Sequence, residues 1–582
     1  MLISFLKDRF LSDIKELVLK NNKTCEKFKP DFDRILKSVR FEEPKNREFG
    51  DLTTNAAMIL SSQVGKKPVD FAQDIRTGIF SKWDMVEKTT IINPGFINFN
   101  LKNTFIIENL NQVFSEGTNF GVNNSGLGKK IQIEYVSSNP TGNLHIGHGR
   151  WGVMGDVLSS IYEKSGYEVQ REYYVNDYGT QAKIFASCVK SIYLKKLGIG
   201  FPYPEEGYPE STVEMVAQRI FSDFGDSFLL NRKEVITDDK AIEKNAICIM
   251  LSFIKDTLSS LGVEFDNWFA ESSLYENNNF EKTIKFLKDN ELVYEQDNAL
   301  WFKSTNYGDD KDRVVIRSDG NPTYFASDIM YLINKKERDF DFLIYILGAD
   351  HHGYVSRLKA ISRSLGMGND AVCIIIGQLV RLVEGKEVLK MSRRKGKGMT
   401  LDDLIKGVGR DAVRYFFCMN SFDTHMDFDL SLARKKSSKN PVFYVQYAHA
   451  RIGSIIRKLK ESKPENISLA ELEEIENTGG KFYRNIIKNL NEFEFKNISE
   501  RNLAWVLSLF PDVVYDACKN NAPYFITRYL YRLSGEFHYF YKHNIIISKN
   551  RVNIKRLVLA IATKTVLKNG LDILGISAPE KM

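Results

Sequence analysis

The strongest constraint on the fold is a strand, a turn, a helix and a strand that follow one another between residues 131 and 175. Residues 131–136 read Ile-Gln-Ile-Glu-Tyr-Val, a strand pattern, and a glycine-rich turn leads into a helix expected over about 149–164. Gly166 ends this helix, and residues 169–175 form a second strand pattern. A helix that joins two neighbouring strands places them parallel, so the unit predicts a Rossmann-like α/β sheet.

The same order returns later in the chain. An apolar strand at 342–347, a helix over about 352–365 and an apolar strand at 372–376 predict a second unit of the same sheet. Residues about 186–300 separate the two units and show long helical patterns, which predicts an inserted helical segment. We therefore expect one Rossmann-like domain over residues 119–395 with an insertion.

Two further domains flank this one, because 582 residues are too many for a single hydrophobic core. Residues 1–118 mix helical patterns with the strand-like Gly-Phe-Ile-Asn-Phe-Asn at 95–100, which predicts an α+β domain. Residues 396–440 are expected to form a connecting helical segment. Apolar residues at helical spacing then predict an all-α helical bundle over 441–582, so the chain is a multidomain α/β protein.

Cysteine usage and hydropathy point to the cytoplasm. The six cysteines are scattered without a Cys-x-x-Cys pair, which favours reduced thiols over disulfides or a structural zinc site. Charges interrupt residues 1–20, and no stretch approaches the roughly 18 to 20 apolar residues that cross a membrane. We expect a cytoplasmic protein that holds no zinc or other metal of its own and makes no membrane contact.

All of the net charge lies in the C-terminal quarter. Residues 440–582 carry 21 Lys and Arg against 14 Asp and Glu, whereas residues 1–439 carry 60 of each sign. A basic terminal domain on a neutral body suggests contact with a polyanion such as a nucleic acid, with a solvated helical face as the alternative. The aromatic residues of 524–540 could stack on unpaired bases, but most of them are expected in the core.

The first concentration of chemistry lies in the turn between the first strand and its helix, Ser-Ser-Asn-Pro-Thr-Gly-Asn-Leu-His-Ile-Gly-His at 137–148. Backbone amides and the positive end of a helix attract phosphate at such a turn, and Gly147 lets a flat base approach. His145 and His148 can donate hydrogen bonds to an α-phosphate. A packed or helix-capping pair is the alternative, and a zinc site lacks nearby further ligands. The candidate nucleotide-binding residues are Pro140, Thr141, Gly142, His145, Gly147 and His148.

The second concentration is the cationic, glycine-bounded stretch Lys-Met-Ser-Arg-Arg-Lys-Gly-Lys-Gly at 390–398. When a nucleophile attacks the α-phosphate of a nucleotide, charge accumulates on the departing pyrophosphate, and cations on a closing loop can stabilise that charge. A solvated basic turn is the alternative. The candidates here are Lys390, Met391, Ser392, Arg393 and Lys395.

The His-Ile-Gly-His and Lys-Met-Ser-Arg-Arg motifs, in this order around a Rossmann-like fold, resemble the two signatures of class I aminoacyl-tRNA synthetases. Over nearly the whole chain the resemblance narrows to bacterial arginyl-tRNA synthetases. It is carried by Ile-Glu-Tyr-Val-Ser-Ser-Asn-Pro-Thr-Gly at 133–142, Tyr-Tyr-Val-Asn-Asp-Tyr-Gly-Thr-Gln at 173–181, Pro-Thr-Tyr-Phe-Ala-Ser-Asp at 322–328, Asn-Pro-Val-Phe-Tyr-Val-Gln-Tyr-Ala-His-Ala-Arg at 440–451, and residues 40–100 and 578–582. The resemblance implies an arginine–tRNA ligase that forms arginyl-adenylate from arginine and Mg-ATP only with tRNA(Arg) bound. It also implies an N-terminal tRNA-binding domain, a C-terminal anticodon-binding domain, and a monomer without an obligatory protein partner.

The resemblance further assigns residues to each substrate. A guanidinium has five donors and a permanent charge, so a selective pocket needs a carboxylate and polar acceptors, with an ordinary half-buried pair as the alternative. Arginine-binding candidates are Glu134, Ser137, Asn139, Gln181, Tyr324 and Asp328, and the ATP pocket adds Gly348, Asp350, His351 and His352, either histidine having a structural role as its alternative. The second signature departs from the family pattern, which has lysine and serine where this chain has Arg393 and Arg394. Either Arg393 or Lys395 is therefore expected to meet the pyrophosphate.

Three other functions share part of this pattern. A class I synthetase for another amino acid would share the ATP chemistry but not the match at 322–328, and a small-molecule adenylyltransferase would lack the basic helical C-terminus. A non-catalytic RNA-binding relative would not need His145, His148 and a cationic second loop. The pattern as a whole favours the arginine–tRNA ligase.

Overall fold

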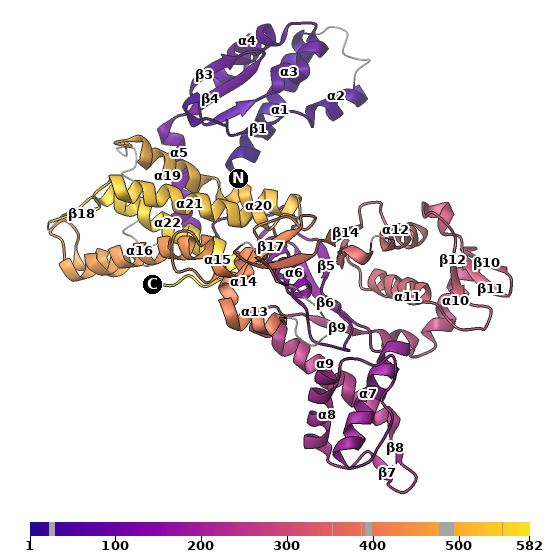
Figure 1. The fold of residues 1–582 in the computed structure, drawn as a ribbon. Helices are drawn as coiled ribbons and strands as arrows, with labels where there is room; N and C mark the ends of the chain where they lie inside the picture. Colours follow the sequence, from indigo (N-terminus) through magenta and orange to yellow (C-terminus); the bar gives the residue numbers. More distant parts are fainter. Residues whose placement is uncertain (22–28, 352, 386, 390–398, 476–493, 550) are drawn as a thin grey trace.

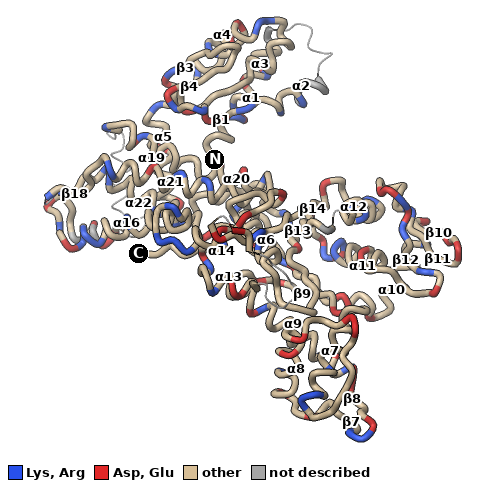
Figure 2. Tube along the Cα trace, in the orientation of Figure 1, with Lys and Arg blue, Asp and Glu red and all other residues tan. Residues whose placement is uncertain are grey.

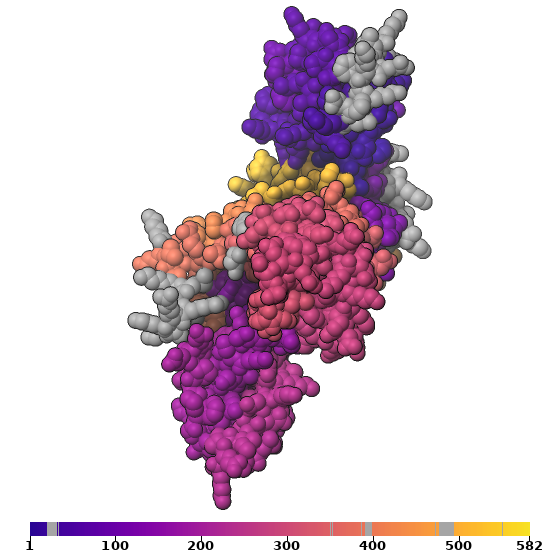
Figure 3. Space-filling view, turned by 90° about the vertical axis from the view of Figure 1, so that its right-hand side faces the viewer, coloured from indigo at the N-terminus to yellow at the C-terminus, as the bar shows by residue number. Residues whose placement is uncertain are grey.

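The computed structural model describes residues 1–21, 29–351, 353–385, 387–389, 399–475, 494–549 and 551–582. An α+β unit at the N-terminus and a lobe formed by the inserted helices extend in opposite directions from a central α/β unit, and a helical unit lies beside the centre (Figures 1 and 3). No described helix is long and apolar enough to cross a membrane.

A five-stranded parallel sheet forms the centre of the molecule (Figure 1). Its elements are β5 (Lys130–Glu134), α6 (Ile146–Lys164), β6 (Glu168–Val175), β9 (Asn267–Ala270), β13 (Phe342–Gly348), α12 (Tyr354–Ser364) and β14 (Val372–Gly377). The strand order is β14-β13-β5-β6-β9, and every neighbouring pair is parallel. α6 joins β5 to β6 and α12 joins β13 to β14, so both predicted strand–helix–strand units are confirmed.

Helix α6 packs unusually close to β5. A Cβ atom at Gly155 would lie 2.4 Å from the ring of Tyr135, which follows β5 directly, so only glycine permits this approach. Fourteen of the 19 residues of α6 are buried, because neighbouring elements cover several sides of the helix. The turn that begins α6 is therefore held against the carboxyl end of the sheet.

The predicted insertion over about 186–300 differs from the structure at its end. The stretch holds most of α7 (Thr180–Lys196), then α8 (Glu210–Phe224), β7 (Leu229–Asn231), β8 (Ile236–Thr237) and α9 (Asp239–Ser260), but it also contains β9. β9 pairs with β6 and is an edge strand of the central sheet. Its four residues, Asn-Trp-Phe-Ala, are too few to show an alternating pattern, and they sit between helices.

A smaller sheet and two helices follow β9 before the chain returns to β13. They are α10 (Asn279–Asp289), β10 (Val293–Gln296), β11 (Ala299–Phe302), β12 (Arg313–Ile316) and α11 (Tyr324–Glu337). After β14, the expected helical connection contains α13 (Leu401–Val408), α14 (Arg410–Phe417) and α15 (Leu430–Ala433), but also β17 (Met426–Asp429), which pairs in parallel with β15 (Val380–Glu384). The connection is thus only partly helical, because Met-Asp-Phe-Asp alternates buried and outward residues.

The N-terminal unit is α+β, as expected. A four-stranded antiparallel sheet, in the order β1-β2-β4-β3, packs with helices, and its core includes Ile97, Phe99 and Leu101 of β4. The bounds are α1 (Leu2–Asn21), α2 (Lys29–Leu36), β1 (Phe41–Glu42), β2 (Leu52–Thr54), α3 (Ala56–Leu60), α4 (Pro68–Gly78), β3 (Val86–Ile92), β4 (Phe96–Leu101) and α5 (Asn103–Glu116). This unit is fastened to the C-terminal helices by two bidentate ion pairs, Arg501 with Asp51 and Arg532 with Glu43.

The C-terminal unit is helical. Its described helices are α16 (Pro441–Ser462), α17 (Leu469–Glu474), α19 (Ile498–Ser508), α20 (Phe510–Lys519), α21 (Tyr524–His543) and α22 (Ile554–Ile573). Lys and Arg recur along these helices (Figure 2). On α21, Tyr529, Phe537 and Phe540 are buried in the core, as expected for these aromatic residues. Tyr531 and Tyr539 are exposed.

A buried arginine ties the C-terminal unit to the sheet domain. Arg414 of α14 is only 1% exposed and donates to the carbonyl oxygens of Leu261 and Leu574, at 2.9 and 2.7 Å. It also pairs with Asp156, in the middle of α6, at 2.6 Å. A guanidinium has five donors in a fixed plane, so one side chain joins three separate segments rigidly.

Candidate active site

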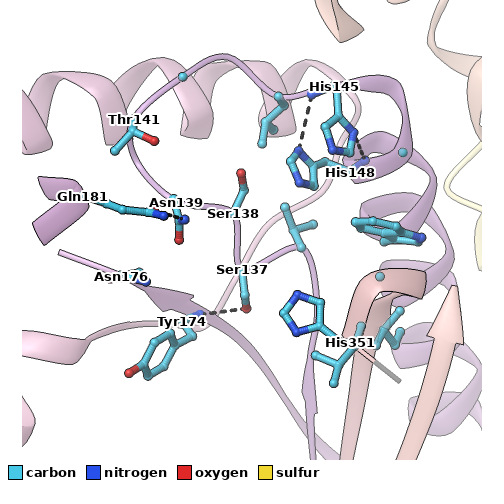
Figure 4. Close-up of a pocket in the computed structure, with 18 of the residues that line it drawn as sticks. Ser137, Ser138, Asn139, Thr141, His145, His148, Tyr174, Asn176, Gln181 and His351 are labelled. Carbon is cyan, nitrogen blue, oxygen red and sulfur yellow. Dashed lines mark hydrogen bonds between the residues drawn. The ribbon is translucent and has the colours of Figure 1, made fainter. Parts of the chain in front are cut away.

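A cavity of about 1390 Å³ opens at the carboxyl ends of β5 and β13 (Figure 4). These strands are neighbours, but β5 leads to β6 on one side of the sheet and β13 leads to β14 on the other. Open α/β sheets bind ligands at such a switch point. The volume exceeds the roughly 300–1,000 Å³ of an ordinary single-ligand pocket, so the cavity has room for more than one substrate.

The turn that leaves β5 has a strained backbone. Val136 and Ser137 have φ angles of 68° and 39°, in the left-handed region that a β-branched residue rarely adopts. The Ser137 hydroxyl accepts from the backbone N–H of Tyr174 at 3.1 Å, and the Tyr173 hydroxyl donates to the carbonyl oxygen of Ser138 at 2.7 Å. Neighbouring strand β6 therefore holds the turn in a conformation that local preferences oppose, as is common at functional sites.

His145 and His148 cap the helix and line the cavity at once. His145 is the N-cap of α6, and its Nδ1 accepts from the backbone N–H of His148 at 3.1 Å. The backbone N–H of His145 donates to Nδ1 of His148 at 3.4 Å, and the two rings stack with centroids 3.5 Å apart (Figure 4). Because each Nδ1 is an acceptor, the proton of each neutral ring is on Nε2. Capping and a place in the site are thus compatible, although the sequence presented them as alternatives.

Gly147 keeps the floor of the cavity open beside these rings. A Cβ at this position would lie 3.0 Å from the His145 ring, so any side chain would crowd the imidazole. The Trp151 ring packs edge-on against His145 and His148, with centroids 5.9 and 5.5 Å away. Trp151 therefore supports both rings from the side of α6.

The remaining nucleotide candidates are distributed unevenly. Thr141, Gly142, Gly348 and His351 line the cavity, whereas Pro140 is buried and is not among the lining residues. Asp350 belongs to the short 3₁₀ helix Ala349–His351 that follows β13, and its side chain lies outside the described part of the structure. His352 and the candidates of the second motif, Lys390, Met391, Ser392, Arg393 and Lys395, lie outside the described residues.

All six arginine-binding candidates line the cavity: Glu134, Ser137, Asn139, Gln181, Tyr324 and Asp328. They come from four places in the chain. Asn139 donates to the side-chain oxygen of Gln181 at 2.6 Å, and this bond joins the turn to the start of α7 (Figure 4). Tyr324 and Asp328 are four residues apart on α11, so one face of that helix presents both side chains.

Glu271, which the sequence did not single out, is a further acidic residue at this cavity. It follows β9 directly, lines the cavity and is only 3% exposed. Its position is typical of functional groups at the carboxyl end of a strand. The short strand β9 was not recognisable from the sequence, so the residue after it could not be placed.

Glu271 and Asp328 form an acidic pair in a poorly solvated place. Burial, with the nearby Asp177 carboxylate, raises the pKa of Glu271 to about 7. Burial, with the charge of Glu271, raises the pKa of Asp328 to about 7 as well. Two carboxyl groups that ionise poorly in the empty cavity would be stabilised by an incoming cation, so this end of the cavity suits a positively charged ligand.

No group of three or more His, Cys, Asp or Glu side chains within the described ranges is placed to hold a metal ion. The described site combines hydrogen-bond donors near a helix N-terminus with carboxylates in the same cavity. The first group suits phosphate and the second suits a cation.

The sequence matches three family models. Residues 109–420 match the catalytic domain of class I (R) tRNA synthetases, residues 445–582 match the DALR anticodon-binding domain, and residues 5–101 match the arginyl-tRNA synthetase N-terminal domain. These three matches correspond to the central, C-terminal and N-terminal units of the structure, respectively.

Individual relatives agree with the family models. The arginine–tRNA ligase of Carboxydothermus hydrogenoformans is 41% identical over 547 residues, which are 94% of each chain. That of Bacillus velezensis is 39% identical over 582 residues, which are 99% of each chain. The structure of Thermus thermophilus arginyl-tRNA synthetase covers 100% of both chains with a TM-score of 0.72 at 19% identity, and it supports the fold. The catalytic-domain match spans more than half of the chain and both ligases match nearly all of it, so this chain belongs to the arginyl-tRNA synthetases, the class I aminoacyl-tRNA ligases for arginine.

Proposed function

We propose that the cavity at the switch point activates arginine with Mg-ATP and then transfers the arginyl group to the 3′-terminal adenosine of tRNA(Arg). One observation carries this assignment to the cavity. A helix N-terminus with two imidazoles, the buried Glu271 and the half-buried Asp328 line the same cavity. A phosphate and a guanidinium therefore have separate, chemically matched places in one enclosure.

The acidic end receives the arginine side chain. Asp328 and Glu271 accept hydrogen bonds from the guanidinium, and Tyr324, exposed at the rim on the same helix, adds a polar hydroxyl. Toward the turn after β5, Ser137, Asn139 and Gln181 bind the amino and carboxyl groups of the substrate together with Glu134. Arginine bound in this direction points its carboxylate toward His145 and His148.

The helix end of the cavity receives ATP. An oxygen of the arginine carboxylate attacks the α-phosphorus, the bond to pyrophosphate breaks, and arginyl-adenylate forms. Nε2–H groups of His145 and His148 and the positive end of α6 stabilise the charge that develops on the α-phosphate. A ribose hydroxyl of the terminal adenosine then attacks the arginyl carbonyl carbon, and AMP leaves. The roles of Lys390, Arg393 and Lys395 at the pyrophosphate stay predictions.

Several broader expectations also stay predictions. They include the domain boundaries, a monomeric and cytoplasmic enzyme that holds no zinc, magnesium that arrives with ATP, and an activation step that requires tRNA. The DALR match over residues 445–582 and the basic charge of that region support contact of the helical unit with the anticodon.

An exchange assay tests the proposed function. Purified protein is incubated with ATP, labelled pyrophosphate and arginine, with and without tRNA(Arg), and lysine, glutamate and cysteine are tested in parallel. We expect exchange with arginine in the presence of tRNA. Exchange with a different amino acid would move the substrate assignment, and binding of tRNA without any exchange would indicate a non-catalytic relative.

The raised pKa values predict a pH dependence of arginine use. The pKa of Asp328 and of Glu271 is about 7, against ordinary values near 4, so at pH 6 both are mostly protonated and bind a guanidinium poorly. The KM for arginine should therefore fall as pH rises from 6 to 8. While the pH is below the pKa, each carboxyl group contributes a fall of up to about tenfold per pH unit, and above the pKa the KM levels off. The stability of the protein without arginine has the opposite pH dependence. Both carboxyl groups raise the free energy of unfolding at low pH, and this contribution is lost as pH rises toward 7. Steady-state aminoacylation at a series of pH values measures the effect, and a KM for arginine that is constant over this range would contradict it.

A further inference from the structure

A charged cluster lies beneath the arginine end of the cavity. Glu134 on β5 and Glu172 on β6 are directly paired neighbours in the sheet, and they are 6% and 0% exposed. Lys335 of α11, which is 1% exposed, reaches both: its Nζ lies 2.5 Å from Oε2 of Glu134 and 3.9 Å from Oε1 of Glu172. None of the assignments made for this chain explains why a lysine is buried here.

The two carboxylates have different main partners. Arg338 binds Glu172 through two nitrogens, at 2.5 and 3.0 Å, and so compensates that charge. Lys335 is the cation nearest to Glu134 among the described ion pairs. The Tyr331 hydroxyl lies between the two acids, 2.9 Å from Oε2 of Glu134 and 2.5 Å from Oε1 of Glu172. The Lys335 ammonium also packs over the rings of Tyr331 and Tyr345, at 4.3 and 3.9 Å, so its position is tightly fixed.

The two oxygens of the Glu134 carboxylate have different hydrogen-bond partners. Oε2 accepts from the buried Lys335 ammonium and lies 2.9 Å from the Tyr331 hydroxyl. Oε1 accepts only a long bond, 3.3 Å, from the Ser137 hydroxyl in the described structure, and Glu134 lines the cavity. A carboxylate oxygen can accept two hydrogen bonds, so Oε1 retains capacity for a donor that enters the cavity.

We propose that Lys335 is a positioning residue for amino-acid binding, which holds the Glu134 carboxylate turned so that its Oε1 accepts from the α-ammonium group of arginine. The proposal rests on the function assigned to the cavity above. A buried ion pair does not by itself favour stability over well-packed apolar residues, so stability alone gives no reason to place these charges here. A carboxylate that is pre-oriented toward a cationic substrate group does give one.

Three variants test the proposal by a double-mutant cycle: Lys335→Met, Glu134→Gln and the combination. Each single change should raise the KM for arginine about 10- to 100-fold, since each removes or disorients a charged hydrogen-bond acceptor. The KM for ATP should stay within about twofold. Because Lys335 acts through Glu134, the double variant should be no worse than Glu134→Gln, and its melting temperature should exceed that of Lys335→Met.

A stability control separates positioning from packing. Tyr415→Phe removes a buried hydroxyl that donates to the Thr527 carbonyl oxygen at 2.9 Å. Tyr415 is not among the residues that line the cavity, so this change should lower the melting temperature without raising the KM for arginine. If Lys335→Met does not fold, Tyr331→Phe removes the hydroxyl that Oε2 of Glu134 shares with Glu172, and it should raise the same KM by a smaller factor. A KM for arginine unchanged in Lys335→Met or Tyr331→Phe, or single effects that multiply in the double variant, would overturn the proposal. Absence of arginine-dependent activity in the wild-type protein would instead overturn the function itself.

Discussion

Replacing Asp328 with asparagine should lower kcat/KM for arginine about 1,000-fold in aminoacylation, mostly through KM, and leave the KM for ATP near its wild-type value. Asparagine keeps the shape of the side chain and removes its charge, so the effect measures the loss of one partner of a desolvated charge pair, which is worth about 2–5 kcal/mol. Asp328 is half-buried beside Glu271, where solvent screens the guanidinium contact poorly.

A matched control comes from the same region of the chain. Asp310 pairs with Arg313 on the surface, and its side chain is 72% exposed, so Asp310→Asn should leave arginine use unchanged. Glu271→Gln should also lower kcat/KM for arginine. If Asp328→Asn retained wild-type kcat/KM while Glu271→Gln lost it, the guanidinium would be bound by Glu271 alone.

The second large effect is expected at the helix that begins the nucleotide site. His148→Asn should lower the rate of tRNA-dependent ATP–pyrophosphate exchange about 100- to 1,000-fold, because a donor aimed at developing charge is removed. Asparagine offers a side-chain oxygen in place of Nδ1 for the backbone N–H of His145, so the cap and the melting temperature should change little. The KM values for arginine and ATP should also change little.

The exposed residue His425 provides the comparison, since it lies outside the lining of the cavity and His425→Asn should be silent. An exchange rate in His148→Asn within a factor of three of wild type would mean that His148 serves the helix cap alone. A fall in exchange together with a large fall in melting temperature would point to the cap as well.

The parts of the fold that follow from periodicity could be predicted, and those set by long-range contacts could not. The strand–helix–strand unit around α6 was predictable because apolar residues alternate in the first strand, a glycine ends the helix, and a second strand pattern follows. β9 was missed because four residues carry no period, and Glu271 was missed with it. The left-handed conformation of Val136 is unpredictable for a different reason: hydrogen bonds from β6 impose a backbone that valine disfavours.

The candidate site shows the same division. Tyr324 and Asp328 could be chosen from the sequence because they occupy one face of a helix next to a motif. Lys335, two turns further along that helix, could not be, because a lysine in a helix is ordinarily a surface residue. Two carboxylates lie next to Lys335 because the register of β5 and β6 pairs Glu134 with Glu172.

The buried Arg414 connects α6, the first helix of the nucleotide site, to the end of α22, the last helix of the chain. Its guanidinium joins Asp156 in the middle of α6 to the carbonyl oxygen of Leu574 just after α22. α6 has 19 residues and is therefore roughly 28 Å long, and its N-terminus carries both imidazoles. A displacement of the end of α22 against the sheet would therefore act, through Arg414, on the middle of the helix whose N-terminus carries His145 and His148.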